Sequence, residues 1–529
     1  MLITITPYSM CRGETVKLSV TDAMFIAIAL AVFWAGILWQ IDLPGIYMDA
    51  VNPDFLAAYT LHPALHNPRW ALPDLGIPFL GGVYFGLENY YLDLAVLPIV
   101  GSGVAGIRIA QALFGAAIVV ALYFLAATAT KNRVVAFAVV AGLATDIAFL
   151  ASFRTKFYVI VSGDVWLLVS LLLLWRGGRK TLFVSGVCYG LAIYAYFVFG
   201  FFAPAIGLIA IIQANKHARI WAAGFATGLL PYVLGYVSFV AAFGNPIDGI
   251  VTLVGQSAGL LRTSSSYLPP LQTIQHDLLW ARLAIDNGGN ELMTFSRVLG
   301  GDWGLIKAAV FALIAIILLF RIPRDRAAMY MMLPASFLAI ATNFGARLWV
   351  HHFSVLVPIA YLLLAVFLGT ALPRRTGTIL AAVCAVVFIG GNVYQAAAFH
   401  GELTTTGGIG KSSDALTRLA DDARADPGTL YVFPEWGFFM PFALETENGV
   451  PYVLDLTDVN RAKARSRRIA LAFWSKSSEP KYREALAALG IVQICDRAYR
   501  QRDGQPAFWV MYGNINPGAA PAECNLPAS

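Results

Sequence analysis

Long apolar stretches alternate with short polar segments from residue 21 to residue 399. The stretches lie at 21–39, 104–128, 132–151, 158–175, 181–213, 219–243, 304–320, 327–345, 350–371 and 377–399. About 20 residues span a bilayer as a helix, so each stretch predicts a transmembrane helix. The stretch 181–213 is too long for one helix and has basic residues at both ends, so we expect two short helices that meet around Phe199–Pro204. The pattern predicts about 11 transmembrane helices.

The composition narrows the class of protein. Of the 529 residues, 58% are hydrophobic and only 13% are charged, whereas a soluble domain carries about 25% charged residues. This excludes a soluble enzyme, a disordered protein and a collagen-like fibre. The apolar stretches are unbroken, while a transmembrane barrel would show alternating strands of about ten residues. We therefore predict a polytopic α-helical membrane protein.

The basic residues of five short loops all fall on one side of the predicted membrane. They are Lys131, Arg133, Arg176, Arg179, Lys180, Lys216, Arg219, Arg321, Arg324, Arg326, Arg374 and Arg375. Short cytoplasmic loops are enriched in Lys and Arg, so this side and the N-terminus are expected in the cytoplasm. Loops at about 41–103 and 244–303 and the tail 400–529 then face outward. The positive charge belongs to the membrane part and indicates no nucleic-acid partner.

The tail differs from the rest of the chain in its pattern. Helical spacing covers Lys411–Ala425 and Lys481–Leu489, and short strands are expected at Thr429–Phe433, Tyr452–Leu456, Ile491–Cys495 and Phe508–Tyr512. This predicts two domains, a membrane domain at 1–399 and an extracytoplasmic α/β domain at 400–529. In an oxidising compartment Cys495 and Cys524 could form a disulfide.

The first outer loop is rich in carboxylates. It holds Asp42, Asp49, Asp54, Asp74, Glu88 and Asp93, against one basic residue, Arg69. Asp49 follows the first helix within about ten residues, so it is expected at the membrane surface. A carboxylate there can accept a proton from a hydroxyl group or hold a divalent cation. Asp54 is the alternative carboxylate, although its position also suits the start of a helix at Phe55.

Two histidines in the same loop have a spacing seen in metal sites. His62 and His66 are four residues apart, which can place two ligands on one helix face. No third ligand is evident, so the alternative is two histidines at the membrane interface.

Several stretches resemble parts of one superfamily. They are a short first helix before an Asp-bearing loop, GGVYFG at 81–86, Tyr90-Tyr91, GIRI at 106–109, GVCYGLAIYAYFVFGFFAP at 186–204, and HHF at 351–353 before Pro358. Together with an outward C-terminal domain they resemble the GT-C superfamily of membrane glycosyltransferases. Protein O-mannosyltransferases and aminoarabinose-type lipid A transferases belong to it. The resemblance is architectural and covers most of 20–400. Ala50 follows Asp49, where some members have an Asp-Glu pair.

The resemblance implies a reaction. Such enzymes move a sugar from a polyprenyl-phosphate carrier to an acceptor in the cell envelope, which can be a lipid, a polysaccharide or a protein, on the outer face of the bacterial inner membrane. Asp49, or alternatively Asp54, would be the catalytic base. The leaving group is an anion, so cations are expected near the outer surface.

The predicted topology supplies candidates for these contacts. Arg108, Arg154, Lys156 and Arg347 lie at outer helix ends, where they can bind the donor phosphate or simply reach toward water. His351 and His352 can donate hydrogen bonds to phosphate or sugar, or form an interfacial pair. Asp164 lies inside an apolar stretch, which marks it as a functional candidate.

Two other functions remain open. A transporter or lipid flippase usually shows internal repeats, and none is evident. A non-catalytic envelope assembly factor has no reason to combine an acidic surface loop with cationic outer turns. If the protein is a transferase, we expect a carboxylate at a cavity that opens sideways to lipid and outward to water.

Overall fold

The protein is described here by a computed structural model. It describes residues 19–52, 54–155, 158–214, 217–261, 268–320, 326–462, 466 and 468–515. Lys156 and Cys524, which were singled out above, lie outside these residues.

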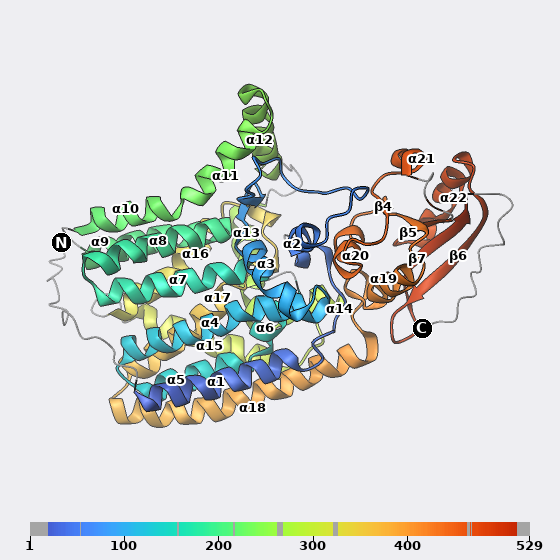
Figure 1. Cartoon of the computed structure of the whole chain (residues 1–529). Coiled ribbons are helices and arrows are strands. Elements are labelled where there is room, and N and C mark those ends of the chain that lie inside the picture. The colour runs from blue at the N-terminus through green and yellow to red at the C-terminus, as the bar shows by residue number, and fades with distance from the viewer. Residues whose placement is uncertain are drawn as a thin grey trace.

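Helices occupy all the predicted membrane positions and run side by side in one bundle (Figure 1). They are α1 (Val20–Leu38), α4 (Val104–Thr130), α5 (Arg133–Thr145) with α6 (Ile147–Leu150), α7 (Tyr158–Arg176), α8 (Arg179–Ala195), α9 (Ala203–Ala214), α10 (Ala218–Gly228) with α11 (Leu230–Ala241), α15 (Asp302–Phe320), α16 (Arg326–Ala341), α17 (Leu356–Val366) and α18 (Arg374–Thr406). By length and composition, 7 helices among the described residues can cross a membrane alone, or up to 8 with the bent pair Arg133–Thr145 and Ile147–Phe153. The predicted class, a polytopic helical membrane protein, is confirmed.

The long stretch 181–213 divides as predicted, but at a different residue. The break lies at Tyr196, whose backbone is extended (φ −161°, ψ 138°), and the 3-10 helix η3 (Phe197–Phe202) follows it. The expected position, Phe199–Pro204, was too late in the chain. Neither glycine nor proline lies at or beside Tyr196, so the local sequence gives no signal for the break.

Short elements from the two long loops gather at the end of the bundle that faces the C-terminal domain (Figure 1). From the first outer loop come η1 (Met48–Val51), α2 (Asp54–Leu61), the hairpin of β1 (Leu80–Gly82) and β2 (Phe85–Gly86), and α3 (Glu88–Val100). From the second come α12 (Pro246–Leu261), α13 (Pro270–Asp286) and α14 (Gly288–Phe295). Both segments expected outside the membrane therefore lie at the same end of the bundle.

The C-terminal domain contains a five-stranded mixed sheet in the order β4-β3-β5-β7-β6. The strands are β3 (Thr429–Val432), β4 (Tyr452–Val453), β5 (Arg468–Phe473), β6 (Val492–Arg500) and β7 (Pro506–Asn514), and the helices are α19 (Ala415–Ala425), α20 (Phe439–Glu445), α21 (Val459–Ala462) and α22 (Glu479–Ala488). β3 pairs in parallel with β4 and β5, and β7 pairs antiparallel with β5 and β6. The central strand β5 was missed in the sequence, and Cys495 of β6 is disulfide-bonded.

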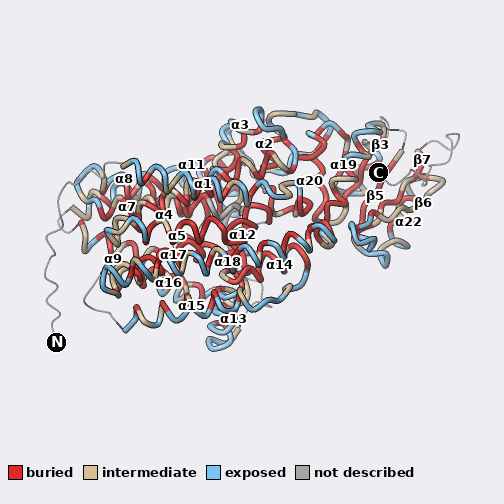
Figure 2. The backbone as a smooth tube through the Cα atoms, turned by 90° about the horizontal axis from the view of Figure 1, so that it is seen from below, coloured by how far each residue is buried: buried red, intermediate tan, exposed pale blue. Residues whose placement is uncertain are grey.

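Figure 2 shows buried residues in the centre of the bundle and exposed residues at its rim. Many of the exposed residues are apolar. Every residue of α17 is buried, whereas α15 exposes Leu313 and Ile316 and α18 exposes Val386 and Val387. A helix that exposes such side chains on its outer face suits contact with lipid tails rather than water. This distribution agrees with a multi-pass membrane protein.

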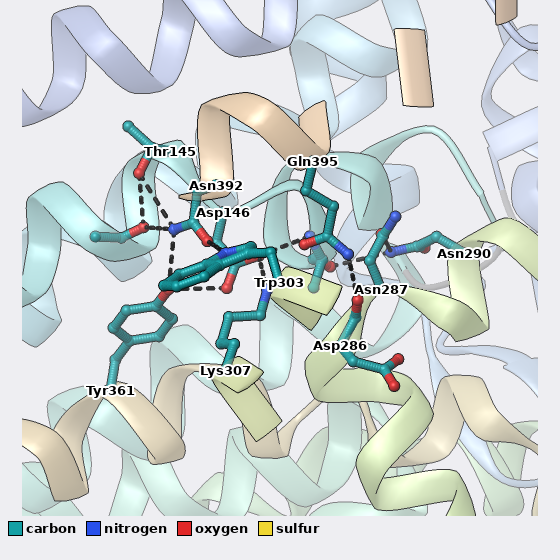
Figure 3. Close-up of polar contacts among 12 residues, drawn as sticks. Thr145, Asp146, Asp286, Asn287, Asn290, Trp303, Lys307, Tyr361, Asn392 and Gln395 are labelled. Carbon is teal, nitrogen blue, oxygen red and sulfur yellow. Dashed lines mark hydrogen bonds and ion pairs between the residues drawn. The ribbon is translucent and has the colours of Figure 1, made fainter. Parts of the chain in front are cut away.

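A polar network is buried among the membrane helices (Figure 3). The chain bends by 59° between α5 and α6, and Asp146 lies at the bend, where one carboxylate oxygen accepts the backbone N–H of Ala148 at 2.9 Å. The same oxygen lies 2.6 Å from Nζ of Lys307 on α15, and Tyr361 of α17 donates to the other oxygen at 2.8 Å. Three helices are thereby fastened to one carboxylate.

Candidate functional site

A cavity of about 550 Å³ opens among the elements that cover the end of the bundle. Its lining residues come from η1, the β1–β2 hairpin, the α8–η3 break, α11, α12 and the segment before α17. They are Asp49, Asn52, Val83, Tyr84, Phe85, Ile193, Tyr196, Phe197, Tyr232, Tyr236, Ser257, Phe344, Arg347, Leu348, Trp349, His351 and His352. The candidates Asp49, Arg347, His351 and His352 therefore share one cavity.

Asp49 is the second residue of η1, a single 3-10 turn that begins ten residues after Leu38, the last residue of α1. Its side chain lines the cavity. Its side chain is half-buried. Burial first, and then the negative charge of Asp49, raise the pKa of Tyr84 in the hairpin turn. Asp49 and Tyr84 line the same cavity, where the carboxylate disfavours ionisation of the tyrosine hydroxyl.

The cationic side of the cavity comes from a segment between α16 and α17. Arg347 ends the 3-10 turn η6 (Gly345–Arg347), and its Nε is buried without a hydrogen-bond partner among the described residues. An unpaired guanidinium nitrogen is costly in a buried place unless a ligand anion joins it. The geometry of Arg347 suits an anion-binding group.

The two histidines of η7 (Val350–Phe353) stand beside Arg347 in the cavity wall. The rings of His351 and His352 have their centroids 3.9 Å apart. The backbone N–H of Trp349 donates to Nδ1 of His352 at 2.9 Å, and Nε2 of His352 lies 3.3 Å from the hydroxyl of Tyr196. These contacts orient the imidazole of His352 in the wall.

Aromatic side chains form most of the remaining wall. Val83, in the hairpin turn, accepts hydrogen bonds from the hydroxyls of Tyr236 at 2.6 Å and Tyr232 at 3.4 Å, and the backbone N–H of Phe197 donates to the carbonyl of Tyr84 at 3.1 Å. The hairpin is therefore tied to α11 and η3. A mainly apolar wall with few placed polar groups is typical of a site for a small or amphipathic ligand.

Several lining residues were not identified from the sequence. Tyr196 lies in the stretch 186–204 that was noted for its resemblance, but nothing local marked it as a wall residue. Tyr232, Tyr236 and Trp349 belong to segments that only the fold brings to the cavity.

Asp54, the alternative base, lies elsewhere. It is the first residue of α2 and is fully buried, as its suitability for a helix start suggested. Its carboxylate accepts a hydrogen bond from Nε2 of Gln111 at 2.6 Å. Burial, followed by the nearby charge of Asp54, raises the pKa of Asp93 on α3 well above its usual range. Asp54 belongs to this buried pair and does not line the cavity.

Arg108 and Arg154 also lie outside the cavity lining. Both guanidinium groups are buried and donate to backbone carbonyls near the end of α1. Asp164 lies buried within α7, and its Oδ1 has no hydrogen-bond partner among the described residues. The structure does not bring these three residues to the cavity.

The spacing of His62 and His66 does not place them on one helix face, because α2 ends at Leu61. In the part of the chain that the structure describes, no group of three or more His, Cys, Asp or Glu side chains could hold a metal ion.

Comparison with known proteins bears on the fold. No protein-family model matches the sequence, and no curated protein sequence matches it. A crystal structure of ArnT from Cupriavidus metallidurans bound to undecaprenyl phosphate does match, with a TM-score of 0.61 at 12% identity, over 94% of this chain and 99% of the ArnT chain. A likeness of this length covers the membrane bundle and the C-terminal domain together. The chain therefore has the fold of ArnT, and the predicted GT-C-like architecture is confirmed.

Proposed function

We propose that the protein is a membrane glycosyltransferase that moves a sugar from a polyprenyl-phosphate carrier to an acceptor in the cell envelope. The observation that carries this proposal is the meeting of Asp49, Arg347, His351 and His352 in one largely aromatic cavity. The solved structure with the same fold was bound to undecaprenyl phosphate, which supports a lipid phosphate as the carrier.

The arrangement suits an attack on the anomeric carbon of the donor sugar. Asp49 removes the proton of the acceptor hydroxyl while the oxygen of that hydroxyl bonds to the anomeric carbon. The bond between that carbon and the phosphate oxygen breaks, and the carrier phosphate leaves with the electron pair. Arg347, His351 and His352 then stabilise the phosphate charge, while the aromatic wall excludes water that would compete with the acceptor.

The direct test is transfer from a polyprenyl-phosphate sugar donor into a cell-envelope fraction, followed by mass spectrometry of the product. A mass increase of one sugar on an acceptor supports the proposal. Movement of the intact donor across the membrane without cleavage would instead indicate a flippase, and no change in either would favour an assembly factor.

Arg347 gives the first prediction. Arg347→Ala is expected to weaken binding of the donor or of undecaprenyl phosphate by about 1–3 kcal/mol, the range for a hydrogen bond to a charged group. Binding can be measured by titration of the purified protein in nanodiscs. Arg297→Ala is the matched control, because Arg297 is 63% exposed, pairs with Glu402 and does not line the cavity. Equal affinities of Arg347→Ala and the parent would place the phosphate elsewhere.

We also propose that the protein lies in the bacterial inner membrane, with its N-terminus in the cytoplasm and residues 400–529 outside. The one-sided basic loops support this orientation. Reporter fusions at Gly178 and Ser412 are therefore expected to report opposite sides of the membrane. The same side for both fusions would contradict the layout.

A further inference from the structure

Two buried arginines hold the segment that leads from α1 to Asp49. Arg154 follows the 3-10 turn η2 (Ala151–Phe153) and is 3% exposed. Its two terminal nitrogens donate to five carbonyl oxygens at 2.5–3.1 Å, those of Gly36, Ile37, Trp39, Gln40 and Leu43. One side chain thus contacts both the last turn of α1 and the residues after it.

The need for such a contact follows from helix geometry. The last carbonyls of a helix have no partner within it, and the helix dipole concentrates negative charge there. α1 has no basic residue in its last turn, so it cannot satisfy these carbonyls itself. The planar guanidinium offers several N–H donors in fixed directions, and Arg154 supplies them from another part of the chain.

Arg108 of α4 binds carbonyls of the same segment. It donates to the carbonyls of Ile41 and Pro44 at 2.6 Å each, and to the carbonyl of Arg154 at 3.4 Å. The two arginines together bind carbonyls from Gly36 to Pro44 and are linked to each other. The segment before η1 is therefore fixed by side chains from two other helical elements.

The following residues are held by the C-terminal domain. Gly45 lies so close to Ser413 that an added Cβ would stand 2.1 Å from its carbonyl oxygen. The backbone N–H of Gly437 contacts the sulfur of Met48 at 3.0 Å. Arg154 and Arg108 hold the first part of the segment between α1 and η1, and the C-terminal domain holds the last part. The backbone of Asp49 therefore has little conformational freedom.

We propose that Arg154 and Arg108 are positioning residues that direct the Asp49 carboxylate into the cavity, and that they do not contact the carrier phosphate. This inference rests on the proposed function, because it takes Asp49 as the base. The terminal nitrogens of both guanidinium groups donate to backbone carbonyls, and both residues lie outside the cavity lining. A misplacement of about 1 Å can lower a rate about 100-fold, so the fastening matters for the chemical step rather than for donor binding.

Arg154→Lys and Arg108→Lys test the inference in the full-length protein. Lysine keeps the positive charge but lacks the planar guanidinium with its several N–H donors. Some of the carbonyls would therefore lose their hydrogen bonds, while the side chain still fills most of the space. We expect kcat to fall about 10- to 100-fold in Arg154→Lys, with the KM for the donor and the affinity for undecaprenyl phosphate within twofold of the parent. Arg282→Lys, at an exposed residue of α13, should change neither. Weakened donor binding at unchanged kcat, or no change at all, would overturn the inference.

A second measurement separates this inference from the proposed function. Several backbone N–H groups of the segment are hydrogen-bonded, among them Leu43 to Gln40 at 2.9 Å and Ala50 to Tyr47 at 2.8 Å. Hydrogen exchange of peptides from 39–52, followed by mass spectrometry, should be faster in Arg154→Lys, while peptides of β7 keep the parent rate. Unchanged exchange at 39–52 would overturn the positioning role. If exchange is faster in Arg154→Lys but the parent protein transfers no sugar, Arg154 does hold residues 39–52 and the proposed function is wrong.

Discussion

Asp49→Asn is expected to lower kcat by roughly 10²–10⁴-fold, the usual contribution of a general base. Asparagine keeps the size of the side chain and its reach into the cavity but has no oxygen that can accept the proton of the acceptor hydroxyl. The KM for the donor should change little, since the phosphate is proposed to contact Arg347 and the two histidines on another part of the cavity wall. Sugar transfer can be followed in nanodiscs with saturating donor.

Asp54→Asn is the matched control for Asp49→Asn. Asp54 is buried at the start of α2 and accepts a hydrogen bond from Gln111 at 2.6 Å, a bond that the asparagine oxygen can still accept. We expect a stability cost of about 1 kcal/mol, as for a helix cap, and near-parent kcat. Loss of activity in Asp54→Asn with full activity in Asp49→Asn would move the base to α2. Full activity in both variants would remove the base from this loop.

The second large effect concerns stability. Lys307→Met is expected to destabilise the protein by about 3–5 kcal/mol, because it leaves the carboxylate of Asp146 buried without its cation. The two side chains are 0% and 1% exposed and lie 2.6 Å apart. The hydrogen bond from Tyr361 remains (Figure 3), but a neutral hydroxyl does not compensate a buried charge. Unfolding in mixed detergent micelles measures the difference.

An exposed ion pair provides the comparison for Lys307→Met. Arg297 and Glu402 lie 2.7 Å apart with 63% and 21% of their side chains exposed, and breaking such a pair is expected to cost about 0–1 kcal/mol. Arg297→Met therefore serves as the matched variant. Equal effects of the two substitutions would mean that water or another group reaches Asp146.

The membrane layout could be predicted because a bilayer imposes one requirement on every span. About 20 apolar residues are needed for each crossing, and the ten stretches from 21 to 399 became α1, α4, α5 with α6, α7 and the later helices. The position of Asp49 near the C-terminal end of α1 followed from chain length alone. No such constraint acts on the C-terminal domain. Its central strand β5 escaped prediction because a five-residue apolar run is equally compatible with a segment of a helix.

The composition of the candidate site could be predicted only in part. The predicted topology assigned Arg108, Arg154 and Arg347 to the same ends of the membrane helices. It gave their position along the helices but not the direction in which each side chain points. Arg347 lines the cavity with Asp49, whereas Arg154 turns to the carbonyls of α1. Backbone carbonyls at a helix end compete with a ligand for each guanidinium group. The sequence does not show which arginine lies near such carbonyls.

The amino-acid sequence by itself determined that this chain enters a membrane, where its apolar helices lie, and that a carboxylate follows the first helix, because these properties depend on local hydrophobicity and chain length. Only the tertiary structure decided that Asp49, Arg347, His351 and His352 meet in one cavity, and that Arg108 and Arg154 bind backbone instead. Those contacts join residues that are far apart in the sequence, and they depend on how the helices pack and rotate against one another, which no local pattern encodes.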